Sequence, residues 1–78
     1  MLKSEELADP NSCFNRARDD EMIFVLLERD IAAPEAIRYW VTKRLRSGKN
    51  QSDDPQIIEA VAIAQKMEDN CVRKKSNA

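Results

Sequence analysis

Side chains that could carry out chemistry are few in this 78-residue chain, and histidine is absent. Histidine is the commonest general acid–base and the commonest transition-metal ligand, so its absence removes the usual centre of hydrolytic and metal chemistry. The single glycine, Gly48, excludes a glycine-rich phosphate-binding loop. No nucleophile lies beside a base in the sequence. We therefore expect no enzymatic activity, no cofactor, no metal and no catalytic residue.

Cys13 and Cys71 lie near opposite ends of the chain. We expect two reduced, partly buried thiols that act as packing groups, as is usual in a cytoplasmic protein. Two alternatives stay open: a disulfide that closes the long loop between them, and a zinc site to which two chains each contribute a pair. Cys13 near a helix start could be reactive, but no base neighbours it.

The tripeptide Asp19-Asp20-Glu21 is the densest acidic cluster. Adjacent carboxylates can bind a hard cation such as Mg²⁺ or contact a basic partner. Helix capping explains the same residues, because aspartate suits an N-cap and Glu21 suits the positive end of a helix dipole. We favour capping and keep Asp19, Asp20 and Glu21 as a second candidate surface for a partner.

The charges divide along the chain. Residues 1–30 have a net charge of −4, residues 31–50 a net charge of +4 and residues 51–78 a net charge of −1. A basic cluster at a helix end can bind phosphate or an acidic protein surface. It can also complement the helix dipole and the acidic first part of the same chain, and we favour this second explanation. The candidate partner-binding residues are Arg38, Tyr39, Lys43, Arg44, Arg46 and Lys49.

Six consecutive apolar residues, 22–27, follow the acidic cluster and predict a segment buried on nearly every side. We predict a helix from about residue 20 to Arg29, capped by Asp19 or Asp20. The competing interpretation is a strand, because Ile23-Phe24-Val25 has a composition typical of strands. A lone strand would leave its backbone groups unpaired, and no second strand-like segment exists in the chain to pair with it. Helix is therefore favoured.

Two later helices have clearer signals. Pro34 suits a first helical position, and Gly48 suits the residue after a helix end. Asp54-Pro55 begins another helix in the same way, which should end near residue 72. The apolar residues of the two helices recur every three or four positions, which predicts one apolar face on each. These residues are Ile37, Trp40, Val41 and Leu45, then Ile57, Val61, Ala64, Met67 and Cys71.

The sequence thus predicts the all-α class, with a small three-helix bundle and a short extra N-terminal helix over residues 13–18. We expect a flexible N-terminus (1–10), a single helical domain (11–72) and a flexible C-terminal tail (73–78). Phe24 and Trp40 are the predicted anchors of the core.

Residues 13–27, followed by Asp30, Ala33-Pro34 and Trp40, resemble a group of small uncharacterised proteins of bacteriophages and prophages. Their shared pattern is Cys, a basic-Ala segment, Asp-Glu, Phe-Val-Leu, Asp, Ala-Pro and Trp, then an Ala-rich helix with a Met near its end. The resemblance covers most of residues 13–68, and Met22 stands where the pattern has Pro. It implies a phage or mobile-element origin and brings no activity or site residue.

We therefore expect a small non-catalytic interaction protein that modulates a host protein or process, host defence included. The alternative is a nucleic-acid-binding protein that uses the basic 38–49 cluster, although the pI of about 5.4 is low for that class. Apolar surface left over from a small core predicts a homodimer. The first residues lack the apolar stretch of a signal peptide, and no apolar run is long enough to cross a bilayer. We expect the cytoplasm, that of the host if a phage encodes the protein, and no membrane contact.

Overall fold

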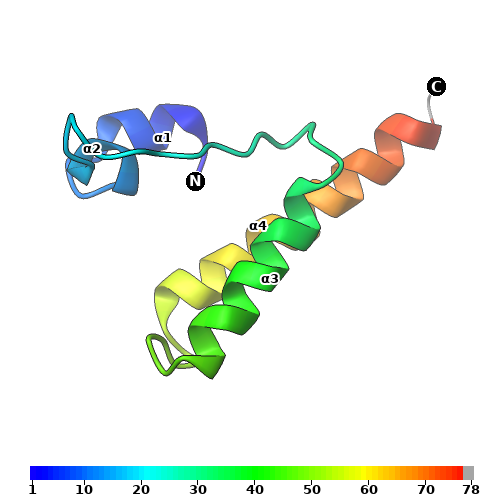
Figure 1. Ribbon diagram of the computed structural model, residues 1–78. Coiled ribbons are helices and arrows are strands. Elements are labelled where there is room, and N and C mark those ends of the chain that lie inside the picture. The colour runs from blue at the N-terminus through cyan, green and yellow to red at the C-terminus, as the bar shows by residue number, and fades with distance from the viewer. Residues whose placement is uncertain (77–78) are drawn as a thin grey trace.

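The computed structural model describes the backbone of residues 1–76 and the side chains of residues 1–70. Within that range the chain forms helices α1 (Lys3–Ala8), α2 (Cys13–Arg16), α3 (Ala33–Arg46) and α4 (Pro55–Ser76), and no strand. The prediction of a small all-α bundle is confirmed. Figure 1 shows α3 and α4 side by side and antiparallel, with α1 and α2 in a separate unit joined to them by a long segment.

Helix α3 begins and ends where its sequence signals predict. The Asp30 carboxylate accepts a hydrogen bond from the Ala32 N–H at 2.9 Å, and this local turn leads into the helix with Pro34 in its first turn. At the other end Gly48 has a φ of 75°, the left-handed conformation that glycine adopts without strain. Lys43, Arg44 and Arg46 occupy the last turn and complement the negative end of the helix dipole.

The loop between α3 and α4 is held by side chains. Asn50 donates to the Asp54 carboxylate at 3.0 Å, and the same carboxylate accepts the Gln51 N–H at 2.9 Å. Pro55 is the first residue of α4, as predicted. The polar loop therefore fixes the turn that makes the two helices antiparallel.

The core of the described chain lies between α3 and α4. Its buried apolar residues are Ala33, Val41, Ile57 and Ala64. Ala33 and Ala64 are fully inaccessible, and such small side chains let the two helices approach closely. Trp40, a predicted anchor, lies at this interface but is only partly buried. The core is small and consists of one helix pair.

The N-terminal unit contains a helix that the sequence did not predict, because α1 forms within residues 1–10. Ser12 caps α2 by accepting the Asn15 N–H at 3.2 Å, and its hydroxyl donates to the Glu6 carbonyl at 2.6 Å. The Asn15 side-chain amide lies within 2.9–3.1 Å of the Glu6, Leu7 and Asp9 carbonyls. These carbonyls lie at the end of α1, and the Asp9 carbonyl also accepts the Ser12 N–H at 3.1 Å, so Asn15 and Ser12 together join the two short helices.

The predicted helix over residues 20–29 is wrong. The Arg18 N–H donates to the Glu21 carboxylate at 3.0 Å, and the Glu21 N–H donates to the Arg18 carbonyl at 3.0 Å, which closes a turn instead of capping a helix. Residues 22–28 then continue without helix. Ile23, Phe24 and Val25 lower the helix propensity of the segment slightly, and because Glu21 is used in a turn no acidic N-cap starts a helix there.

The predicted burial of this segment is also wrong. Met22 is 99% exposed and Phe24 87% exposed, so Phe24 is not a core anchor.

At the other end of the chain, α4 continues to Ser76, four residues beyond its predicted end at 72. Residues 77 and 78 of the predicted tail, and the side chain of Cys71, lie outside what the structure describes.

Candidate functional site

The predicted basic cluster divides into two groups, and the first serves the helix pair itself. Arg38 forms an ion pair with Glu68 of α4 at 2.5 Å, which supplies Glu68 with a partner that the sequence did not reveal. The Arg44 guanidinium lies 5.2 Å from the centre of the Trp40 ring, and its Nε donates to Asn50 at 2.6 Å. Arg38 and Arg44 thus join α3 to α4 and to the loop.

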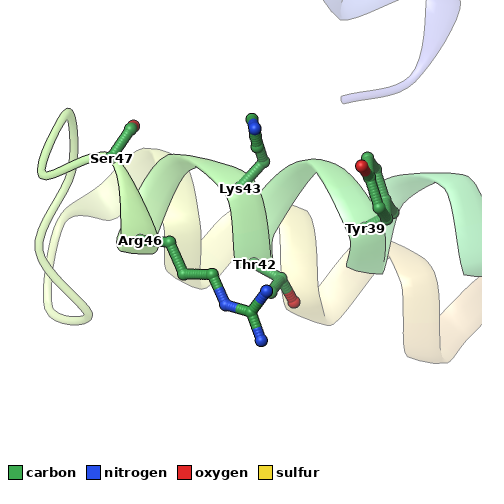
Figure 2. Close-up of a pocket in the computed structure, with 5 residues that line it drawn as sticks. All are labelled: Tyr39, Thr42, Lys43, Arg46 and Ser47. Carbon is green, nitrogen blue, oxygen red and sulfur yellow. The ribbon is translucent and has the colours of Figure 1, made fainter.

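The second group consists of Tyr39, Lys43 and Arg46. Together with Thr42 and Ser47 these residues form an exposed face of α3, which we call the basic face. These residues line a shallow depression of about 230 Å³. Figure 2 shows Tyr39, Lys43 and Ser47 along one edge of the helix and Thr42 and Arg46 along the other. The two edges follow from the helix period, since residues four positions apart lie above one another. Lys49, the remaining predicted residue, is exposed in the following loop.

The chemistry of the basic face is that of binding. Lys43 and Arg46 supply two cations, and Tyr39, 72% exposed, supplies a flat ring and a hydroxyl. The Thr42 hydroxyl donates to the Arg38 carbonyl at 3.0 Å, and the Ser47 hydroxyl donates to the Arg44 carbonyl at 3.1 Å. Both hydroxyls therefore already donate to backbone carbonyls of α3. The face can bind carboxylates or phosphates through charge-assisted hydrogen bonds.

We predict a small contribution from the Arg38–Glu68 pair. Its side chains are 40% and 47% exposed, so solvent screens the interaction, and a double-mutant cycle with Arg38→Ala and Glu68→Ala should give a coupling of about 0.5–1 kcal/mol. The coupling should decrease in 1 M salt. Denaturant unfolding of the four proteins measures it. A coupling above about 2 kcal/mol would contradict the exposed geometry.

The second predicted surface, Asp19-Asp20-Glu21, lies on the exposed turn that precedes the apolar segment. Asp20 forms an ion pair with Arg18 at 3.7 Å, and both side chains are highly exposed. The Glu21 carboxylate accepts the Arg18 N–H within the turn. These three residues do not lie on a helix, so the capping role favoured from the sequence is wrong.

A second hollow is an apolar groove, larger than the depression on the basic face, and the sequence did not predict it. It encloses about 1040 Å³ between the N-terminal unit, the 22–27 segment and α4. Leu7 and Phe14 line it from the N-terminal unit, and Ile63 and Met67 from α4. Phe14 is 47% exposed and lines this groove. The signal that could have revealed the groove is the excess of apolar residues over what one helix pair can bury.

The described residues also bear on the thiol, metal and membrane predictions. Cys13 is a free, exposed thiol, which corrects the expected partial burial. No group of three potential ligands that could hold a metal ion occurs in residues 1–70. No described helix combines the length and the hydropathy that a membrane span requires.

Comparisons with known proteins give no relative from which a role could be transferred. No family model matches the sequence, and neither a curated protein nor a solved structure is similar to the chain.

Proposed function

We propose that this protein is a small non-catalytic interaction protein whose basic face binds an acidic surface of another protein. The observation that carries the proposal is the division of the basic cluster. Arg38 and Arg44 are used within the helix pair, whereas Lys43 and Arg46 point to solvent beside an exposed Tyr39. Tyrosine and arginine are enriched in protein interfaces because they combine contact area with hydrogen bonding.

The cellular role in this proposal is modulation of a host protein by a phage-encoded factor. It is supported by the resemblance of residues 13–68 to small phage and prophage proteins. A binder of this kind needs no reaction centre, because occupying a surface of the host protein is enough to alter its activity. Host defence is one process on which such a factor would act.

The alternative, binding of nucleic acid by the basic 38–49 cluster, is less well supported. With Arg38 and Arg44 engaged in the helix pair, the cations left for phosphates are Lys43, Arg46 and Lys49. Non-specific affinity for nucleic acid depends on the number of phosphates neutralised, and three contacts give only weak binding at physiological salt. The net charge of −1 adds no attraction over the whole chain.

Affinity capture with paired charge-reversal variants tests the proposal. The double variant Lys43→Glu/Arg46→Glu removes the basic face, and Arg18→Glu/Arg29→Glu makes the same change of net charge on the exposed connecting segment. We expect wild type and the Arg18/Arg29 variant to recover the same protein from a bacterial lysate, and the Lys43/Arg46 variant to lose it. Recovery of no common protein, or equal recovery by all three, would overturn the proposal.

A binding titration distinguishes the nucleic-acid alternative from the proposed protein-binding function. Labelled duplex DNA and single-stranded RNA should show no anisotropy change with micromolar wild-type protein at low salt. A change that increases as salt decreases, and that disappears in Lys43→Glu/Arg46→Glu, would instead favour the nucleic-acid function.

A further inference from the structure

Residues 22–27 form an uncovered apolar segment unlike any other part of the described chain. Met22, Ile23, Phe24, Val25 and Leu27 are all at least half exposed, and Leu26 is intermediate. Single exposed apolar side chains are ordinary on a protein surface, but a run of this length is rare on a monomer and marks an interaction site. The segment is continuous with the apolar groove, which its residues 23–27 help to line.

The backbone of this segment is also unpaired. Within the part of the chain that the structure describes, no hydrogen bond reaches the N–H or C=O groups of residues 22–26. Figure 1 shows the connection as a non-helical trace that runs from α2 to the start of α3. A non-helical segment with free backbone groups and apolar side chains on both sides has the properties of a strand that lacks its neighbour.

The accessible surface of the chain is too large for a monomer of its mass. It measures 6606 Å², whereas folded monomers of 9.0 kDa expose roughly 4,900 Å². The excess is roughly 1,700 Å², and even half of it reaches the roughly 800 Å² that each partner buries in a stable interface. The excess surface is therefore large enough to form an interface of standard size with a partner.

We propose that the partner is a second copy of this chain, which covers residues 22–27 by pairing its own 22–27 segment as an antiparallel strand. In a two-fold symmetric dimer the same surface meets itself, and a segment that crosses the two-fold axis at a right angle is necessarily antiparallel to its copy. The second copy supplies the strand that a single chain lacks. Pairing satisfies the free backbone groups, and the packed copy covers the apolar groove beside them.

The charges of the chain are compatible with this pairing. Residues 22–27 carry no charge, so two copies meet there without like-charge repulsion. The basic face on α3 does not line the groove, and the dimer therefore leaves it free. This inference uses a different surface from the proposed function, so either one can fail without the other.

A matched pair of substitutions tests the dimer. Phe24→Asp places a charge in the 22–27 segment, and Tyr39→Asp makes the same change at an exposed aromatic residue of α3. Both side chains are more than two-thirds exposed, so neither change disturbs the helix core. Circular dichroism should show unchanged helix content in both variants. Light scattering over a concentration series gives the mass of each protein.

We expect wild type and Tyr39→Asp to have a mass of about 18 kDa, twice the 9.0 kDa of the chain. Phe24→Asp should have the single-chain mass, with a dissociation constant raised by roughly 100-fold or more, because each dimer loses two central aromatic contacts. A wild-type mass equal to one chain at all concentrations would overturn the proposal. So would a dimer that Phe24→Asp leaves intact, since another surface would then form it.

Hydrogen exchange tests the pairing itself. The amides of residues 23–26 have no described partner in the single chain and should exchange at the rate of an unstructured peptide when the protein is monomeric. In the dimer we expect protection of at least roughly 100-fold in alternate amides, and loss of that protection in Phe24→Asp. Unprotected amides in a wild-type dimer would rule out strand pairing.

Discussion

Ile57→Ala is expected to destabilise the protein by about 2–4 kcal/mol, whereas Ile58→Ala should change the free energy of unfolding by less than about 0.5 kcal/mol. The two residues are neighbours on α4 and lose the same atoms. They differ in burial: Ile57 is 3% exposed and Ile58 56% exposed. Ile57 is the largest of the four buried apolar side chains. Its truncation leaves a cavity that the small side chains of Ala33 and Ala64 cannot fill.

The size of this effect matters because the core is small. Domains of about this length have roughly 4–12 kcal/mol of stability in total, and the loss of several kcal/mol would leave a measurable unfolded fraction at 37 °C. Urea unfolding followed by circular dichroism measures both variants. Because alanine favours helix more than isoleucine, Ile58→Ala should be neutral or slightly stabilising. Equal destabilisation by the two variants would show that the Ile58 face of α4 is covered as well.

The sequence determined α3, its loop and the start of α4 because their signals are local. Pro34 lies in the first turn of α3, Gly48 takes a left-handed conformation, and Asp54 precedes Pro55, the first residue of α4. Each depends only on backbone geometry within a few residues, so a single sequence is enough to predict it. The apolar stripes also placed Val41, Ile57 and Ala64 correctly in the core.

The 22–27 segment could not be predicted because its signals conflict. Six apolar residues require cover, but a short run without periodicity does not distinguish a helix from a strand. The decision for helix depended on the absence of a second strand within the chain. That argument considers one copy only, and it has no force if the pairing partner is another molecule. The exposed segment is therefore where reasoning from a single chain fails.

The basic face was predicted as part of a larger set, and the structure reduces it. Arg38 and Arg44 could not be separated from Lys43 and Arg46 by sequence, because all four lie within a few turns of one helix. Their separation depends on Glu68, thirty residues away, and on Asn50 in the loop. The Glu68 partner follows from the way α4 packs on α3, and the Asn50 partner follows from the path of the loop. No local signal in the sequence specifies either one.

Trp40 and Phe24 were both predicted to anchor the core, and the structure assigns them different effects. Trp40→Ala should cost about 1.5–3 kcal/mol, which is below the value for a fully buried tryptophan because the ring is only partly covered. The variant also loses the cation–π contact between the ring and the Arg44 guanidinium, which lies 5.2 Å from the ring centre; such a contact contributes about 0.5–1 kcal/mol. Phe24→Ala should leave the helix pair of a single chain unchanged, because the ring does not lie in that core.

Tyr39→Ala is the matched control for Trp40→Ala, since the two aromatic residues are adjacent on α3 and Tyr39 is largely exposed. Its unfolding free energy should stay within about 0.5 kcal/mol of wild type. Unfolding is followed by circular dichroism, because the loss of the single tryptophan removes the fluorescence signal. A double-mutant cycle of Trp40→Ala with Arg44→Ala isolates the cation–π contact, because Arg44→Ala alone also removes the hydrogen bond to Asn50. If Trp40→Ala cost no more than the coupling energy of this cycle, the ring would contribute only through its cation and not through packing against α4.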